Sequence, residues 1–232
     1  MSNRWVAPLK AIYTTLFPST CACCGQVLVA GERQVCLDCM VDLSPQAFGR
    51  NMDNPAERQL LGMYNMGAAM AMCRFVKGGT VQHAVHAMKF HSNTELCLLM
   101  GRQLGSEVVA SGRFDDVDLL VPVPLHWLRR LGRGYNQSLL LCRGMAEVFG
   151  RPIEEDNLVR HRYTHKQSTS RASQRDANVM GAFRVRHPER LADKHILLVD
   201  DVLTTGATLR ACADALAVVP GIKVSVAVFS MV

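Results

Sequence analysis

The segment 196–208 limits the fold of this 232-residue chain more than any other part of the sequence. It begins with four apolar residues in a row, Ile-Leu-Leu-Val, which are typical of a short strand buried on both faces of a sheet. Two carboxylates, Asp200 and Asp201, follow this run, and a helix is predicted over 208–219. Because ligands of open parallel sheets bind where the strands end, this order of residues predicts a binding site at 200–208.

The residue types after this strand suit a phosphate group attached to a sugar. We assign five consecutive residues to phosphate binding: Thr204, Thr205, Gly206, Ala207 and Thr208. A helix N-terminus offers unpaired N–H groups and partial positive charge, hydroxyls add donors, and glycine lets the backbone approach closely. Carboxylates repel phosphate, so we expect Asp200 and Asp201 to bind the vicinal hydroxyls of a ribose, directly or through Mg²⁺. The alternative is an ordinary strand–loop–helix with a threonine cap and a solvated acidic pair.

Segments on both sides of 196–208 complete an α/β pattern. We expect strands at 118–123, 158–161, 183–185 and 223–229, an earlier strand or hairpin over 63–75 that breaks at Gly67, and helices at 80–90, 95–110 and 137–149. Strands that alternate with helices predict a mostly parallel sheet covered by helices on both faces. We divide the chain into an N-terminal helix and cysteine module at 1–45, a linker or loose helix at 46–60, and an α/β domain at 61–232.

Five of the nine cysteines lie within nineteen residues near the N-terminus. Four of them form two Cys-x-x-Cys pairs: Cys21, Cys24, Cys36 and Cys39. Two such turns facing each other supply the tetrahedral thiolates that zinc prefers, and Gly25 gives the first turn a permissive backbone. Such a site has no open position, so we expect structural Zn²⁺. Disulfide pairing is the alternative, which a reducing cytosol disfavours. Cys23 breaks the two-residue spacing and is left out.

Positive charge gathers in the second half of the chain. The net charge is +6, and the segment 126–190 alone holds thirteen Lys or Arg residues against six Asp or Glu residues. Such a segment attracts phosphates, diphosphates or nucleic acid, although a solvated surface gives the same pattern.

The sequence predicts a cytoplasmic protein with no membrane partner. No apolar run is long enough to span a bilayer, and the N-terminus lacks a secretory signal. Apolar residues before Pro18 have roughly helical spacing, which we interpret as an amphipathic helix packed on the protein itself.

Segment 196–208 resembles the phosphoribosyl-diphosphate signature of type I phosphoribosyltransferases. Over nearly its full length, the chain also resembles the ComF family of bacterial competence proteins, whose members are also called GntX-like. Besides the paired cysteines, the resemblance rests on His-Ala-Met-Lys-Phe at 86–90, Val-Pro-Val-Pro at 121–124, Arg130, Arg-Gly-Tyr-Asn-Gln at 133–137, Thr-His-Lys-Gln at 164–167, Arg175 and Asn-Val-Met-Gly-Ala-Phe at 178–183. It implies a phosphoribosyltransferase-type α/β fold with a mostly parallel sheet, flanked by helices, and a small N-terminal zinc module with four cysteine ligands.

The resemblance also implies roles for residues after the strand at 118–123. A diphosphate-binding loop starts at Pro124, and Arg130 and Arg133 would reach diphosphate oxygens with the geometry that guanidinium favours. Asn136 and Gln137, at the start of a helix, would cap that helix or bind the ligand. A helix-entry turn without a ligand role is the alternative.

A long polar segment, 160–182, lies where phosphoribosyltransferases keep a flexible lid. Closing such a lid would exclude water and bring positive charge to the leaving diphosphate. The candidate cations are Lys166, Arg171 and Arg175, and Lys89, at the end of an earlier helix, is a further candidate. Each of them could equally be a solvated surface cation.

A catalytic site of this kind would transfer a ribosyl group from phosphoribosyl diphosphate to an acceptor. Asp200 and Asp201 would position the sugar. Diphosphate would leave the anomeric carbon, stabilised by Mg²⁺ and by cations such as Lys166 and Arg175. The sequence identifies no pocket for the acceptor.

Two interpretations without turnover stay open. The resemblance to ComF implies a role in DNA uptake during natural transformation, beside a helicase and recombination proteins of the competence machinery. The basic segment 126–190 is compatible with binding of single-stranded DNA, although it holds few aromatic residues that could stack on bases. The chain could also be an adaptor whose α/β domain no longer turns over a substrate.

Overall fold

The computed structural model describes residues 18–90, 93–125, 134–161 and 181–232. Several sequence-based assignments lie outside the described residues, namely Arg130, Arg133, Lys166, Arg171, Arg175 and the helix expected before Pro18. Within the described residues, no helix is both long and apolar enough to cross a bilayer.

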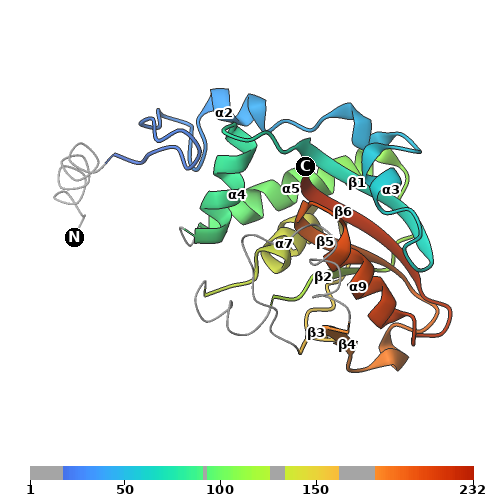
Figure 1. Cartoon of the computed structure of the whole chain (residues 1–232). Helices are drawn as coiled ribbons and strands as arrows, with labels where there is room; N and C mark the ends of the chain where they lie inside the picture. The colour runs from blue at the N-terminus through green and yellow to red at the C-terminus, as the bar shows by residue number, and fades with distance from the viewer. Residues whose placement is uncertain (1–17, 91–92, 126–133, 162–180) are drawn as a thin grey trace, which may run out of the picture.

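A parallel four-stranded sheet forms the centre of the protein (Figure 1). Its strands, in order across the sheet, are β1 (Met66–Arg74), β6 (Lys223–Met231), β5 (His195–Leu203) and β2 (Leu119–Pro122). Every neighbouring pair is parallel, which confirms the sheet type predicted from the sequence. The apolar run of β5 lies in the middle of this sheet and is buried on both faces.

Helices cover both faces of the sheet. The long helices are α4 (Thr80–Phe90), α5 (Thr94–Ser111), α7 (Gln137–Phe149) and α9 (Ala207–Leu216). Figure 1 shows α4, α5 and α7 on one face and α9 on the other. Leu197 and Val199 of β5 belong to the core on the α5 and α7 side, whereas Ile196 and Leu198 belong to the core on the α9 side. This alternation follows from the two-residue period of a strand.

Helices α5 and α7 approach each other closely because glycines face each other at the crossing. A Cβ atom on Gly101 would clash with the carbonyl of Leu141, and one on Gly144 would clash with the carbonyl of Leu98. A larger residue at either position would push the two backbones apart. The crossing therefore holds α7, and the N-terminal turn that α7 presents to β5, in one place.

The shorter elements are α2 (Leu37–Asp42), the 3₁₀ helices η1 (Ala47–Arg50) and η2 (Pro188–Arg190), α3 (Pro55–Gln59), β3 (Leu158–Arg160) and β4 (Phe183–Val185). Helix α3 lies in the segment expected to be a linker or loose helix. Its first turn is capped by Asn54, whose side-chain amide also donates to the carbonyl of Ala69 in β1 at 2.8 Å. Because Asn54 and Leu60 are buried, this segment packs against the sheet.

Two details differ from the sequence-based prediction. Strand β5 continues through Asp200 and Asp201 to Leu203, because it keeps its parallel register with β6 as far as Met231. The acidic pair therefore lies within the strand and not in the loop that follows. Among the described residues, strands β3 and β4 pair only with each other, in an antiparallel two-stranded sheet outside the main one.

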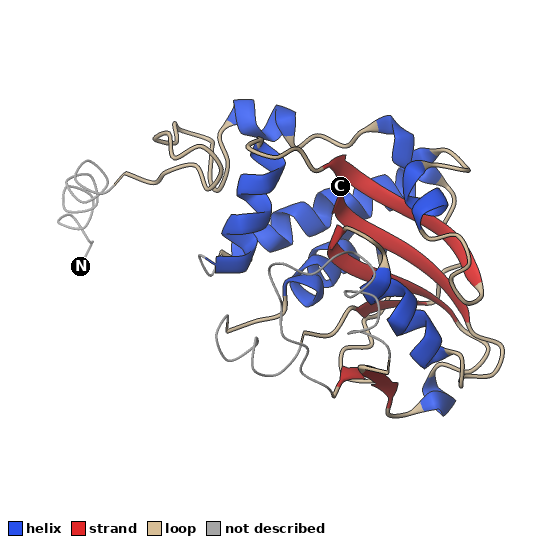
Figure 2. Cartoon of the chain, in the orientation of Figure 1, coloured by secondary structure: helices blue, strands red, loops and turns tan. Residues whose placement is uncertain are grey.

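The cysteine module consists mainly of turns before α2 (Figure 2). An isolated antiparallel bridge joins Thr20 and Val27. Helix α2 then packs near the start of α4, where the hydroxyl of Thr80 donates to a carboxylate oxygen of Asp42 at 2.6 Å. Helix α4 therefore links the module to the sheet.

Candidate ligand-binding site and cysteine cluster

The acidic pair lies at the carboxyl end of β5, beside the first turn of α7. One carboxylate oxygen of Asp200 accepts two hydrogen bonds, from the Ser138 hydroxyl at 3.0 Å and from the Asp201 N–H at 2.9 Å. Burial raises the pKa of Asp200 to about 7, and the negative charge of Asp201 contributes to this rise. Asp200 is therefore only partly ionised at neutral pH.

The second carboxylate, Asp201, is paired with Lys89. The Lys89 Nζ lies 2.8 Å from Asp201 Oδ2, and the two side chains are 23% and 13% exposed. Lys89 belongs to the last turn of α4, so this ion pair joins two elements that are far apart in the sequence. From the sequence, Lys89 was only a candidate for contact with the diphosphate.

A cavity of about 410 Å³ opens beside the acidic pair. Its polar lining consists of Lys89, Asn136, Gln137, Ser138, Arg160, Asp200, Asp201, Thr204 and Thr208. Its apolar lining includes Phe75, Val85, Val123, Pro124, Leu125, Val202 and Val232. Cavities of this size and mixed lining are typical of sites for small molecules.

The loop at 204–206 leads from β5 into α9. Thr204 and Thr208 line the cavity, whereas the Thr205 hydroxyl accepts a long hydrogen bond from the Ala207 N–H at 3.4 Å. Gly206 has a φ of 81°, and a Cβ atom there would lie 3.0 Å from the Leu60 side chain. Only glycine suits this turn, because it adopts positive φ readily and leaves room for the neighbour.

The loop is supported from behind by residues that no sequence motif singled out. Arg210 of α9 donates to the carbonyl of Thr205 at 2.8 Å and also to the carbonyl of Gln59 at the end of α3. Together with the Leu60 side chain, these contacts hold the loop at one position. An arginine one turn into a helix is so common in sequences that its presence alone does not predict this supporting role.

Asn136 and Gln137, which the resemblance offered as helix caps or ligand-binding residues, both line the cavity. Asn136 also caps α7: its side-chain oxygen accepts from the Ser138 N–H at 3.2 Å, and its amide donates to the carbonyl of Val123 at 3.1 Å. The residue thus ties the end of β2 to the start of α7. Ser138 was not selected from the sequence, although it stands next to Gln137 in the same turn.

Arg160 also lines the cavity, from the end of β3. Its guanidinium lies over the ring of Phe183 in β4, 5.3 Å from the ring centre. The sequence placed Arg160 at the start of a polar segment, 160–182, most of which lies outside the described residues.

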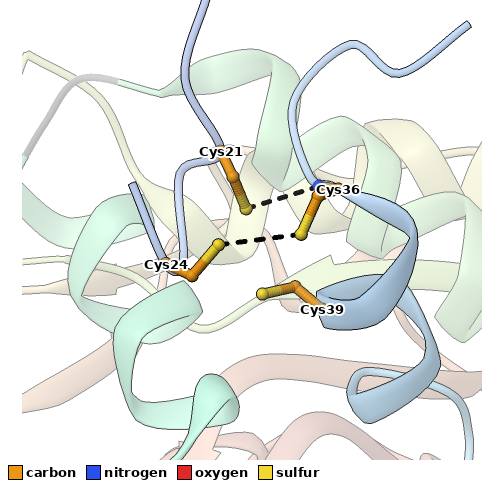
Figure 3. Close-up of side chains that lie close together, drawn as sticks. All are labelled: Cys21, Cys24, Cys36 and Cys39. Atoms are coloured by element: carbon orange, nitrogen blue, oxygen red, sulfur yellow. Dashed lines mark hydrogen bonds between the residues drawn. The ribbon is translucent and has the colours of Figure 1, made fainter. Parts of the chain in front are cut away.

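The four predicted cysteine ligands come together, as Figure 3 shows. The sulfur atoms of Cys21, Cys24, Cys36 and Cys39 all lie within 4.8 Å of one another. A tetrahedral site with metal–sulfur bonds of about 2.3 Å has sulfur–sulfur distances of roughly 3.8 Å, so one ion fits among them. Gly25 has a φ of 77°, as the expected turn requires. Cys23 is buried beside the cluster but does not belong to it.

Backbone N–H groups point at the sulfur of Cys21. The N–H of Cys36 lies 3.3 Å from this sulfur and that of Cys23 lies 3.4 Å from it. Burial alone would raise the pKa of Cys21, but these N–H groups and that of Cys24 lower it to about 6. Cys21 therefore favours the thiolate, which is the form that binds a metal, whereas burial raises the pKa of Cys39.

Part of this chain is similar to known proteins. Residues 136–230 match the phosphoribosyl transferase domain. The DNA utilization protein YhgH of Salmonella typhi is 36% identical over 135 residues, which cover 57% of this chain and 59% of that protein. Competence protein F of Haemophilus influenzae is 33% identical over 93 residues, which cover 40% and 41% of the two chains.

Among solved structures, the glutamine phosphoribosylpyrophosphate amidotransferase of B. subtilis, complexed with ADP and GMP, is 18% identical. It aligns with 60% of this chain and 26% of its own, with a TM-score of 0.36. This chain spans about three fifths of the length of the YhgH protein described above.

The matched domain contains the acidic pair, the loop into α9 and the first turn of α7. The four-cysteine cluster precedes it. Residues 136–230 of this chain therefore resemble a phosphoribosyl transferase domain, and part of the chain is similar to the proteins named DNA utilization protein YhgH and competence protein F.

Proposed function

We propose that the cavity at the end of β5 binds the ribose 5-phosphate part of phosphoribosyl diphosphate. One observation carries this proposal: Asp200, Asp201 and the start of α9 line the same cavity. The two carboxylates are each engaged through one oxygen. Within the part of the chain that the structure describes, the second oxygen of each makes no hydrogen bond. A pair of vicinal hydroxyls could bind there, because the Asp201 oxygen accepts a hydrogen bond and the Asp200 oxygen accepts one when ionised or donates one when protonated.

The phosphate would bind at the N-terminus of α9. Thr204 and Thr208 offer hydroxyl donors on the cavity side, and the first turn of the helix offers N–H groups and a positive dipole. Arg210, from the same helix, does not replace these donors, since its guanidinium is turned toward Thr205 and α3.

The diphosphate would extend from the sugar toward Pro124 and Leu125, which also line the cavity. The candidate cations Arg130 and Arg133 follow these residues in the sequence. Arg160 lines the cavity, and the candidate cations Lys166 and Arg175 follow it in the sequence. Mg²⁺ bound with the diphosphate would neutralise the negative charge that develops on the leaving group. An acceptor with a flat apolar ring would fit the part of the cavity formed by Phe75, Val85 and Val202.

A thermal-shift titration tests this proposal directly. Phosphoribosyl diphosphate with Mg²⁺ should raise the melting temperature of the wild type, because a ligand that binds only the folded state stabilises it. The double variant Asp200→Asn with Asp201→Asn should lose the shift. Asp156→Asn with Asp214→Asn removes two exposed carboxylates and is the matched control, which should keep it. No shift in the wild type, or an equal shift in the acidic-pair variant, would exclude this site.

Release of diphosphate would distinguish an enzyme from a binding protein. The assay would add purine and pyrimidine bases one at a time to the protein with the magnesium complex of phosphoribosyl diphosphate. Diphosphate that is released with one base, and is not released by the Asp200→Asn, Asp201→Asn variant, would establish pentosyl transfer.

We infer that the four cysteines hold a structural Zn²⁺ ion. Four thiolates leave no open position for substrate, and a module of this size buries too little apolar surface to fold alone. Its residues Val27, Val29 and Leu37 are more than half exposed, which supports this view. We propose that the protein acts in the reducing cytosol, where free thiols persist and can bind a metal.

Binding of single-stranded DNA is the second candidate function. It is favoured by the name of the relatives, DNA utilization protein, and by the positive charge of segment 126–190. We propose that such binding would place the protein beside a helicase and recombination proteins. Salt-sensitive gel retardation by the wild type, lost on replacing the arginines of 160–175 by alanine, would support it. Equal retardation by the variant would count against it.

A further inference from the structure

Lys89 places a positive charge inside the candidate cavity, at a point where the proposed function needs none. Its Nζ lies 2.8 Å from Asp201 Oδ2, and both side chains are mostly buried. Val85, one turn earlier in α4, lines the same cavity. Helix α4 therefore presents one apolar and one cationic side chain to the space next to the acidic pair.

The charge of Lys89 decides what kind of ligand the acidic pair can accept. Two adjacent carboxylates that face a cavity would ordinarily attract a divalent cation, whose preferred ligands are carboxylate oxygens. An ammonium group in contact with Asp201 repels a cation at that position, and the repulsion is strong because the pair is poorly exposed to solvent. Uncharged hydroxyl groups do not feel this repulsion and can still donate to both carboxylates.

We propose that Lys89 makes the acidic pair selective for the hydroxyl groups of a sugar phosphate over a free divalent cation. This inference rests on the proposed function, because it assigns a property to the same site. A second property of the site follows from it. A metal ion would enter only when already bound to the diphosphate, whose negative charge offsets that of the ion. Free Mg²⁺ would not load the site in advance.

The hydrogen bonds around Asp200 fit this role. Its engaged oxygen receives two donors from the protein, the Ser138 hydroxyl and the Asp201 N–H, and no cation contacts it among the described residues. The arrangement gives each carboxylate a fixed partner and a fixed direction before any ligand arrives. Lys89 is therefore a positioning residue for Asp201 as well as a charge.

Calorimetric titration of the purified full chain tests the inference with two separate probes, MgCl₂ alone and ribose 5-phosphate without metal. The variants are Lys89→Met, which keeps the aliphatic stem without the charge, and Lys89→Arg, which keeps the charge. Lys77→Met is the matched control, since Lys77 is exposed and lies just before the same helix. Circular dichroism establishes that each variant is folded, and Lys89→Gln replaces Lys89→Met if the latter is not.

Loss of the charge should raise the affinity for Mg²⁺ by about tenfold or more, because a like charge in contact is removed. It should also weaken ribose 5-phosphate binding, because Asp201 loses the contact that orients it. Lys89→Arg and Lys77→Met should both behave like the wild type toward Mg²⁺. The inference fails if Lys89→Met and the wild type bind Mg²⁺ equally.

The two probes separate failure of this inference from failure of the proposed function. If ribose 5-phosphate binds the wild type but the Mg²⁺ affinity does not respond to Lys89→Met, the proposed function stands and the role of Lys89 is wrong. If ribose 5-phosphate binds no form of the protein while the Mg²⁺ affinity rises in Lys89→Met, the charge effect of Lys89 stands and the sugar phosphate is wrong.

Discussion

Strand β5 carries a cluster of polar side chains at each end, and the two clusters differ in how their polar atoms are used. At the carboxyl end, Asp200 and Asp201 each have one carboxylate oxygen without a hydrogen bond to the described residues, beside a cavity of about 410 Å³. At the amino end, His195 lies beside a larger cavity of about 670 Å³. Each charged residue that lines the second cavity forms an ion pair with a described residue.

The pairing at the amino end is extensive. Lys223 Nζ lies 2.6 Å from Asp116 Oδ2, and His195 Nδ1 lies 3.0 Å from the other oxygen of Asp116. Arg113 and Glu57, which also line this cavity, form an ion pair with each other. Comparison of the two ends therefore teaches that cavity size alone does not select the candidate binding site. Polar atoms that remain available to a ligand are the better criterion for proposing one.

The amino-end cluster also resembles a catalytic triad without being one. The Ser225 hydroxyl lies 2.8 Å from His195 Nε2, and Asp116 contacts the other ring nitrogen of His195. Ser225 is completely buried, however, and its oxygen accepts a hydrogen bond from the Ala68 N–H at 2.9 Å. Gly67 covers it so closely that a Cβ atom there would lie 2.6 Å from the hydroxyl oxygen. No substrate reaches this oxygen, so the cluster ties β1, β5 and β6 together.

The largest expected difference between the two ends is in ligand affinity. Asp201→Asn should weaken binding of ribose 5-phosphate by about 10- to 100-fold, the cost of losing a hydrogen bond to a charged group. His195→Gln should leave the affinity unchanged, since His195 lies at the other end of the strand. Calorimetric titration of both variants measures this. An equal loss of ribose 5-phosphate affinity in the two variants would show that the two ends of β5 do not differ in ligand binding.

The next largest effect is on stability at the amino end. Ser225→Ala should lower the free energy of unfolding by about 1–3 kcal/mol, because the buried Ala68 N–H and His195 Nε2 lose their partner. Urea denaturation measures this free energy of unfolding. A titration of Ser225→Ala with ribose 5-phosphate should give the same affinity as the wild type. Labelling of Ser225 by a fluorophosphonate in the wild type would contradict its structural role.

The two ends should respond to pH in opposite directions. The folded pKa of Asp200 is raised to about 7, so its protonated form stabilises the fold and that stability is lost as pH rises from about 4 through 7. Burial and the nearby Lys223 lower the pKa of His195, so its contribution is present above its ordinary pKa and is lost as pH falls below about 6.5. Asp200→Asn should therefore raise stability by roughly 1–3 kcal/mol at pH 8 and have little effect at pH 4.

Denaturation curves of the wild type, Asp200→Asn and His195→Gln across this pH range measure the two responses. In Asp200→Asn, the free energy of unfolding should depend less on pH near neutrality than in the wild type. In His195→Gln, the loss of stability at acidic pH should be smaller than in the wild type. If Asp200→Asn is destabilised equally at both pH values, its carboxyl group is ionised in the folded protein and the comparison needs revision.

The smallest expected effect lies at the rim of the second cavity. Asp53 forms an ion pair with Arg58, and both side chains are mostly exposed. Exposed pairs of this kind contribute little to stability because water and salt screen them. Asp53→Asn should change neither the melting temperature nor the affinity for ribose 5-phosphate. A measurable loss of ligand affinity would indicate that the second cavity takes part in binding.

The sequence predicted much of the fold because the relevant signals are local. The apolar run before Asp200 marks a strand, the two Cys-x-x-Cys pairs mark a ligand set, and a glycine occupies the turns that need positive φ at Gly25 and Gly206. The continuation of β5 to Leu203 was not predicted, since it depends on pairing with β6 and adjacent aspartates usually leave a strand.

Contacts between distant parts of the chain were not readable in the sequence. Lys89 and Asp201 meet only because α4 packs beside the end of β5, and the Asn54 side chain finds its partner in β1. The support of Gly206 by Leu60 depends in the same way on where α3 lies. Such contacts follow from the tertiary arrangement, which no local pattern contains.

The glycine crossing of α5 and α7 has a mechanical consequence for the cavity. The backbones that meet at Gly101 and Gly144 hold α7 in place, and α7 begins with the turn that brings Ser138 to the cavity. Lys89 reaches the same cavity from α4 through a side chain of four methylenes, held by its ion pair with Asp201. A larger ligand would therefore gain room by breaking this ion pair and moving the lysine side chain before it could move the backbone of α7.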